Sequence, residues 1–302
     1  MPAEYPFTPN TLRIGPLPDN ADWVGFPPPL LHPEMAIRLP ILSQNEDWMA
    51  LYKPPAISAD RHPLESTYPV LASAINDQLS PEKPELAPLQ MEKAYGVGSI
   101  DAVASGIAWF AKHRRAAAHI RNEIGSGKVQ FEAILLVKDE GASEDTSELI
   151  TCDLPIARHH SEPRMRISHK TGKKSSTSFQ RLQTKPPFGL WLARSVYPRK
   201  DQWLLHAHEK KLPIPGDLRY AQIPPLSRPY NKPKNAPQWM DSNSQKTNSE
   251  SATQAHWWPF PAIHLRRISW NTPSQETVTI ECPLPKNFRA MLRHVFPEWA
   301  ES

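Results

Sequence analysis

Cysteine and glycine are both scarce in this chain. The two cysteines, Cys152 and Cys282, are far apart and show no zinc-ligand spacing, so neither a disulfide framework nor a structural zinc site is expected. Only 11 of the 302 residues are glycine, and no glycine-rich phosphate-binding loop is found. The low cysteine count is typical of a protein from a reducing compartment.

Long apolar runs and targeting signals are absent as well. No stretch approaches the ~20 apolar residues that a membrane-spanning helix needs, and the first residues lack the basic and apolar regions of a secretory signal. We therefore expect a soluble, cytoplasmic protein without a membrane partner. The net charge of +4 is mild; it permits a polyanionic partner but does not demand one.

Proline, by contrast, is abundant. The 35 prolines predict long extended or irregular connections, whereas 10 tryptophans and a hydrophobic fraction of 39% indicate a folded core. We interpret the proline-rich residues 1–38 as an extended arm. The main domain is predicted over 39–298, with a polar insertion at 222–259 that is expected to be disordered.

Residue patterns predict mainly strands, with few helices. Hairpins are expected at 41–53 and 263–282, each around a polar turn. Further strands are expected at 107–110, 129–137, 178–183, 190–197 and 202–206, and helices at 68–79, 112–124 and 286–295. No strand–helix–strand unit recurs, so the predicted class is α+β around a largely antiparallel central sheet with flanking helices and loops.

One carboxylate, Asp101, is notable for its position. It lies among small residues that end at Gly106, directly before the apolar run at 107–110. An aspartate beside a core strand can face a substrate, where it could act as a nucleophile. It can equally serve only as a loop residue, and these residues alone leave both interpretations open.

Two basic regions could contact phosphates. They are the polar side of the predicted helix 112–124 and the segment 158–174, and their candidate residues are Arg114, Arg115, Arg158, Arg164, Arg166 and Lys173. Clustered cations suit the backbone of a nucleic acid, although a solvated basic surface explains them as well. No metal site is predicted, because the histidines at 159, 160, 206 and 208 have no carboxylate at ligand spacing.

Several motifs, taken in order along 41–292, resemble those of the RluA/RsuA type of RNA pseudouridine synthase. The stretch NEDWMALYKP at 45–54 is similar to the family's opening hairpin, and SIDAVASG at 99–106 is similar to its HRLDxxTSG. Shorter matches are VQFEA at 129–133, PIARH at 155–159, STSF at 176–179, LPIPGDLRY at 212–220, IHL at 263–265 and CPLP at 282–285. Each piece alone is weak, and it is their order that indicates kinship.

The resemblance implies a pseudouridine synthase-like fold, with the catalytic domain over 39–298. Asp101 would be the nucleophile that attacks a flipped uridine, so that the base detaches, rotates and rejoins through carbon without a metal or cofactor. The partner would be a structured RNA, either rRNA or tRNA, and the enzyme a monomer. Residues expected to bind the substrate are Phe131, Arg199, Lys200, Gln202 and His206.

Three positions depart from the family pattern. Ser99 stands where the family has a basic residue, Phe131 replaces a tyrosine, and Leu204 replaces the arginine that pairs with the catalytic aspartate. A partly buried carboxylate without its cation is disfavoured in the charged form. This last departure therefore bears directly on activity.

The departures leave two main hypotheses. In the first, the chain is an active enzyme in which Arg199 or Lys200 supplies the missing charge. In the second, it is an RNA-binding relative that keeps the fold and the cleft without catalysis. A cation within ~4 Å of the Asp101 carboxylate would favour the first. A third interpretation has the N-terminal arm or Trp257-Trp258 filling the cleft.

Overall fold

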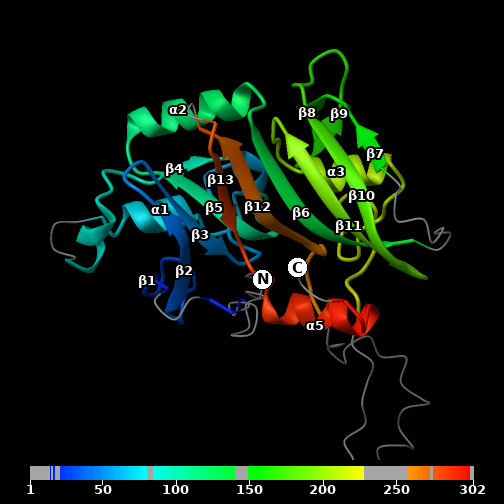
Figure 1. The fold of residues 1–302 in the computed structure, drawn as a ribbon, viewed down its shortest axis with the longest axis horizontal. Helices are drawn as coiled ribbons and strands as arrows, with labels where there is room; N and C mark the ends of the chain where they lie inside the picture. Colours follow the sequence, from blue (N-terminus) through cyan, green and yellow to red (C-terminus); the bar gives the residue numbers. More distant parts are fainter. Residues whose placement is uncertain are drawn as a thin grey trace, which may run out of the picture.

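A mixed sheet of eleven strands organises the residues that the computed structural model describes, namely 14, 16–17, 21–79, 84–98, 100–139, 149–227, 257–272 and 275–299 (Figure 1). Its strands are β1 (Trp23–Phe26), β2 (Ile37–Gln44), β3 (Trp48–Lys53), β4 (Tyr95–Val97), β5 (Ser105–Ala111), β6 (Val129–Lys138), β7 (Leu149–Cys152), β10 (Ser176–Lys185), β11 (Phe188–Val196), β12 (Ile263–Asn271) and β13 (Thr277–Glu281). The order across the sheet is β1–β2–β3–β5–β12–β6–β11–β10–β7, with β4 paired to β5 and β13 to β12. Two further strands, β8 (Ile156–Arg158) and β9 (Met165–Ile167), form a separate ribbon.

Among the hydrogen-bonded strand pairs described in this sheet, only β5 with β12 is parallel, and the others are antiparallel. They meet at the pairs Ser105–His264 and Gly106–Leu265. Gly106 has φ 132°, and a Cβ there would lie 2.2 Å from the carbonyl oxygen of Leu265. Only glycine permits this close approach. The largely antiparallel α+β fold expected from the sequence is confirmed.

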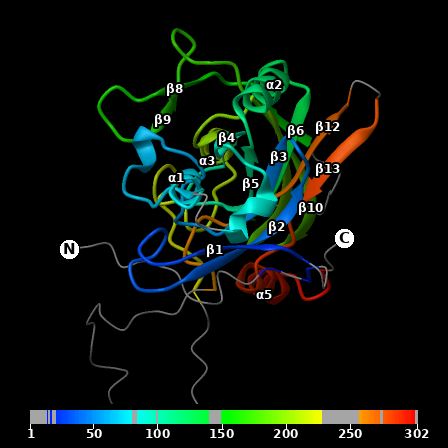
Figure 2. The same cartoon turned by 90° about the vertical axis from the view of Figure 1, so that its left-hand side faces the viewer.

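The helices flank the sheet. They are α1 (Leu71–Asn76), α2 (Arg114–Gly125), α3 (Gln202–Glu209) and α5 (Lys286–Val295), with short 3-10 turns η1 (Pro63–Glu65) and η2 (Pro84–Leu89). Figure 2 shows α1, α3 and the β8–β9 ribbon on one side of the sheet. Every residue of β3 and β5 is buried, as expected of strands whose two faces are both covered.

Most of the predicted elements are confirmed. The hairpin at 41–53 is β2–β3, the helix at 286–295 is α5, and the strand at 129–137 is β6. The strand predicted at 202–206 is wrong, because these residues begin the helix α3. The run Trp203-Leu204-Leu205 is apolar and short, and such a run fits a buried helix as well as a strand.

The N-terminal arm is partly built into the sheet. β1 pairs with β2, and Val24 and Phe26 are buried. Because β2 begins at Ile37, the arm and the main domain share a sheet and do not separate at residue 38. Residues 1–13, 15 and 18–20 of the predicted arm and residues 228–256 of the predicted insertion lie outside the described residues.

Candidate active site

The loop that carries Asp101 is fixed by a buried lysine. Lys53, at the end of β3, is 0% exposed, and its Nζ donates to the carbonyl oxygens of Ala102 and Ala104 at 3.2 and 2.7 Å. The same Nζ donates to the carbonyls of Pro54 and Ile57. Lys53 therefore joins the β3 end to the residues that directly follow Asp101. Burial lowers the pKa of this lysine to about 7.

Asp101 itself is 5% exposed. One carboxylate oxygen, Oδ1, accepts a hydrogen bond from the backbone N–H of Asp201 at 3.0 Å. Burial raises the pKa of Asp101 to about 7; the negative charge of Asp201 acts in the same direction, and the Lys200 ammonium opposes both. Near neutral pH, the protonated and ionised forms of this carboxyl are therefore both populated.

Two buried ion pairs flank Asp101. Lys200 Nζ lies 2.7 Å from Glu65 Oε2 and also donates to the carbonyl of Ile100, the residue before Asp101. Glu65 in turn accepts the backbone N–H of Ala102 at 2.7 Å. Burial would raise the pKa of Glu65, but the Lys200 charge and these hydrogen bonds outweigh burial and hold it below its usual value.

The second ion pair involves Asp201. Arg219 donates to both carboxylate oxygens of Asp201 at 2.6 and 2.7 Å, and the Tyr220 hydroxyl donates to Oδ2 at 2.7 Å. This contact with both oxygens fixes the position of Asp201. It thereby also fixes the backbone N–H from which Asp101 accepts its hydrogen bond. Burial, followed by the Asp201 charge, raises the pKa of Tyr220.

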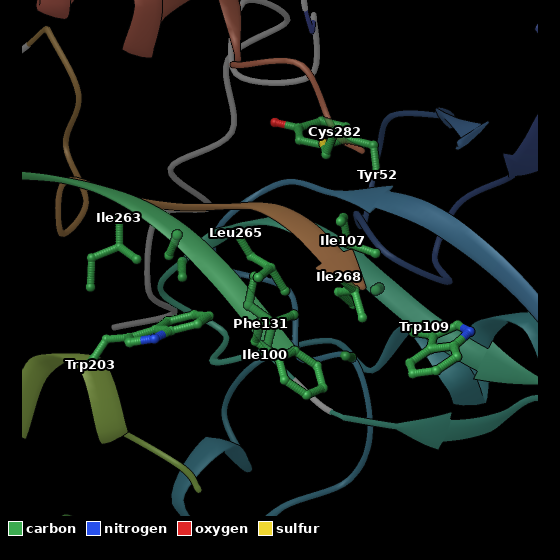
Figure 3. Packing of buried hydrophobic residues seen from close by; sticks show 14 of the residues in the cluster. Tyr52, Ile100, Ile107, Trp109, Phe131, Trp203, Ile263, Leu265, Ile268 and Cys282 are labelled. Carbon is green, nitrogen blue, oxygen red and sulfur yellow. The ribbon is translucent and has the colours of Figure 1, made fainter. Parts of the chain in front are cut away.

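A small pocket opens over Asp101. Its lining includes Ile100, Phe131, Arg199, Trp203 and Leu265, and Figure 3 shows Trp203 approaching from α3 toward the strands that carry Phe131 and Leu265. The cavity measures about 10 Å³, which holds about one water molecule. A uridine base is far larger, so its entry requires that side chains of the lining move.

The predicted substrate-binding residues separate into two groups. Phe131, Arg199 and Gln202 line the pocket with Asp101, whereas Lys200 lies behind it and pairs with Glu65. The amide of Gln202 is held by Ser176 and Thr177.

His206 is not part of the pocket. It is 0% exposed, and its ring nitrogens contact Thr177 Oγ1 and the carbonyl of Leu154 at 3.0 and 2.9 Å. In this structure the ring cannot touch a substrate, because the core covers it and both nitrogens already have partners. The expectation of substrate contact is therefore contradicted for His206, which anchors α3 to β10.

The predicted RNA-binding residues lie in two places. Arg114 and Arg115 begin α2, while Arg158 and Arg166 lie on β8 and β9, with Arg164 and Lys173 beside that ribbon. Figure 1 places α2 and the ribbon along one end of the molecule. Arg164 is engaged by Glu162 at 2.6 Å. The structure thus puts both groups on the surface without joining them into one patch.

The structure can be compared with the departures from the family pattern and with the third interpretation, in which the cleft is filled. Leu204 is buried, and no Lys or Arg of the described ranges forms an ion pair with Asp101. Ser99 lies outside the described residues. Trp257 stacks on His294 and Trp258 packs against Phe288, both of α5, so these tryptophans do not fill the Asp101 pocket.

Four residues of the site were not found from the sequence: Lys53, Glu65, Asp201 and Arg219. Lys53 was noted only as part of a Lys-Pro motif, and Arg219 only as part of LPIPGDLRY. Glu65 lies in an irregular stretch far from Asp101 in the chain, and nothing in its neighbours indicates a role.

Neither a metal site nor a membrane-spanning helix is found in the described part of the chain. None of its groups of His, Cys, Asp and Glu has the three or more members that could hold a metal ion. None of its helices is long and apolar enough to cross a bilayer.

Comparison with solved structures identifies the fold. Human RNA pseudouridylate synthase domain containing 4 matches with a TM-score of 0.55 and 15% identity, over 84% of this chain and 92% of that chain. Human RNA pseudouridylate synthase domain containing 1 matches with a TM-score of 0.48 and 17% identity, over 82% and 84%. No protein-family model and no curated protein matches the sequence. The chain has a pseudouridine synthase-like fold.

Proposed function

We propose that this protein is an RNA pseudouridine synthase of the RluA/RsuA type, with Asp101 as its nucleophile. The observation that carries the proposal is the placement of Asp101: on a pseudouridine synthase-like fold, it lines a pocket whose wall includes the ring of Phe131. The substrate would be a uridine of structured RNA, either rRNA or tRNA, and the enzyme a cytoplasmic monomer. A base reaches such a pocket only after leaving its stack, and an aromatic wall can then hold it.

The reaction is an isomerisation and balances without a cofactor. The bond from ribose C1′ to N1 of uracil breaks, and a bond from C1′ to C5 forms. One proton leaves C5 and one is taken up at N1. The carboxylate of Asp101 would attack the flipped nucleotide and be released at the end, so it must be ionised when the substrate binds.

The Lys200 ammonium supports the ionised form of Asp101, against burial and the charges of Asp201 and Glu65. Asp101 belongs to a cluster of three basic side chains, Lys53, Lys200 and Arg219, and three carboxyls, its own and those of Glu65 and Asp201. The cluster is neutral when Asp101 is ionised and Lys53 is protonated, and equally when that proton has passed from Lys53 to Asp101. Lys200 acts on Asp101 from the Glu65 pair, and in this proposal it replaces the arginine that Leu204 displaces.

One observation favours the second candidate, a non-catalytic RNA-binding relative. Asp101 has no ion-pair partner within the described ranges, and its pKa is raised to about 7. A carboxyl that stays protonated would be a poor nucleophile. We favour the enzyme because the Lys200 charge lowers the pKa of Asp101, and because a pH above 7 ionises the group.

The two candidates differ in one experiment. The purified protein is incubated with total RNA from a strain that lacks it, pseudouridine is mapped, and Asp101→Asn serves as the matched variant. Asn keeps the acceptor for the Asp201 N–H, so the fold should persist. Sites that form only with the unmutated protein would support the enzyme. Intact RNA binding without any new pseudouridine, at pH 7 and at pH 8.5, would establish the non-catalytic relative.

A further inference from the structure

Apart from the Asp101 pocket, a groove of about 1090 Å³ runs along α2. Arg115, His119 and Glu123 line it from the helix, and their spacing of four residues puts them on one helical face. The opposite wall consists of three tryptophans from three strands: Trp48, Trp109 and Trp270. We call this cavity the tryptophan groove.

The tryptophans fill a split in the sheet. β5 and β12 pair only at residues 105–106 and 264–265, and beyond this point Trp109 and Trp270 stack with ring centroids 4.8 Å apart. Trp48 meets both rings edge-on. Trp270 is only half-buried, so an aromatic surface borders the cavity.

A hydrogen-bond donor in the same wall is unused. Trp109 is 2% exposed, and its indole N–H has no partner among the described residues. A buried polar group without a partner is costly. That nitrogen is enclosed and lies out of reach of a ligand in the groove, so the accessible aromatic surface of this wall is that of Trp270.

Charge at the rim is mixed: Glu46, Asp47 and Glu123 line the groove together with Arg115 and Lys128. Arg114 and Arg115 occupy the first turn of α2, which contains no acidic residue, although cations there oppose the helix dipole. Both are exposed, and neither pairs with a carboxylate of the described residues. Two acidic residues of the groove are already engaged, Asp47 by His113 at 3.0 Å and Glu123 by Lys128 at 3.1 Å. Arg115 therefore remains available to a phosphate.

The groove adjoins the Asp101 pocket. Val129 lines the groove and Phe131 lines the pocket; they are two residues apart on β6, so their side chains point to the same side of that strand. A strand of RNA that places one nucleotide over Asp101 can thus extend into the groove.

We propose that the tryptophan groove binds unpaired nucleotides of single-stranded RNA. A base stacks on the face of Trp270 that Trp109 leaves uncovered, and Arg115 contacts a backbone phosphate. This combination of aromatic surface and flanking cations is how single strands are bound without sequence preference. The proposal concerns binding outside the Asp101 pocket and does not depend on catalysis.

The test measures binding of a fluorescein-labelled ten-nucleotide oligouridine to the full chain by anisotropy, at two salt concentrations. Trp270→Ala should weaken binding by about tenfold. Arg115→Ala should weaken it by a similar factor and reduce its salt dependence. The matched controls are Trp23→Ala and Arg38→Ala, since both residues are exposed on the β1–β2 edge. These controls should leave the affinity within twofold of the unmutated protein.

Two further variants keep the test decisive. Glu46→Gln removes a carboxylate of the groove and should strengthen RNA binding, whereas it would weaken the binding of a basic peptide. The oligouridine measurement reports binding alone, so a failure of the pseudouridine assay leaves this proposal standing. If Trp270→Ala misfolds, Arg115→Ala and Trp270→Phe replace it. Unchanged affinity in both Trp270 and Arg115 variants would overturn the proposal, and so would preferential binding of a proline-rich peptide in the groove.

Discussion

The backbone N–H of Asp201 donates to Oδ1 of Asp101 at 3.0 Å, across a separation of 100 residues in the chain. Asp201 has φ 56°, in the left-handed region that aspartate tolerates, and its own carboxylate is held by Arg219. Asp101 thus receives a neutral donor from a residue whose charge repels it. The protonation state of Asp101 depends on these neighbours as much as on burial.

The first prediction concerns the pH dependence of the reaction. A nucleophilic carboxylate must be ionised, and the pKa of Asp101 is about 7, so turnover should rise with pH through about 7. Glu65→Gln removes a negative charge and should move this inflection to lower pH, by about one unit. Lys200→Gln removes the cation and should move it to higher pH. Single-turnover rates between pH 5.5 and 9 measure both shifts.

The two variants should shift the pH inflection in opposite directions, and this distinguishes an electrostatic effect from general damage to the site. Glu34→Gln, at an exposed carboxylate outside the site, is the control and should leave the inflection in place. Shifts of the same sign in the Glu65 and Lys200 variants would contradict the assignment.

A second prediction concerns stability. The pKa of Asp101 is raised in the folded protein. Between pH 4 and 7, therefore, the carboxyl is protonated in the folded state but already ionised in the unfolded state. The Asp101 contribution to the free energy of unfolding therefore falls as pH rises through this window, by up to about 1.4 kcal/mol per pH unit. Asp101→Asn should be more stable than the unmutated protein at pH 8 and equal to it near pH 4. Urea titrations at both pH values measure the free energy of unfolding of the two proteins. The same difference between variant and unmutated protein at pH 4 and at pH 8 would refute the prediction.

Lys53 carries the third prediction. Lys53→Met keeps the apolar stem but leaves the carbonyl of Ala104 without its buried donor, at a cost of about 1–3 kcal/mol for an unsatisfied group; the carbonyl of Ala102 still accepts the N–H of Ala56. We expect a loss of several degrees in Tm and a fall in kcat under conditions where the variant is folded. Lys112→Met is the control, because Lys112 is also buried but donates to the side chain of Gln44. A normal kcat in Lys53→Met would show that the Asp101 loop does not need this lysine.

The fourth prediction separates His206 from Arg199. His206→Ala should reduce the free energy of unfolding by about 2–4 kcal/mol, since it opens a cavity and removes the buried hydrogen bonds of the ring to Thr177 and Leu154, with little change in KM for RNA. Arg199→Ala should do the reverse, because Arg199 lines the pocket. A raised KM in stably folded His206→Ala would show that this histidine contributes to substrate binding.

The elements predicted well from sequence have patterns that one packing environment explains. The run at 129–137 is apolar because β6 is buried between β12 and β11, and α5 carries Phe288, Met291, Leu292 and Val295 on one buried face. The prediction of a strand at the start of α3 was wrong because Trp203-Leu204-Leu205 fits a strand or a helix equally. Tertiary packing decided the outcome.

The site was only partly accessible from sequence for a related reason. Asp101, Phe131 and Arg199 stand in recognisable motifs, and all three line the pocket. The Lys200–Glu65 pair joins positions 135 residues apart, and its formation depends on how the irregular stretch after β3 packs beneath the loop of Asp101. No local pattern of residues encodes such a pair.

The position of β12 has a consequence for how the chain is made. β12 lies between β5 and β6, yet it is synthesised long after both. Until Ile263–Asn271 leaves the ribosome, β5 and β6 each present an unpaired edge, and Gly106 has no Leu265 to pack against. The nascent chain therefore holds two half-sheets with open edges, a state prone to association with other chains. Ribosome-bound chains truncated before residue 263 should recruit chaperones that full-length chains release.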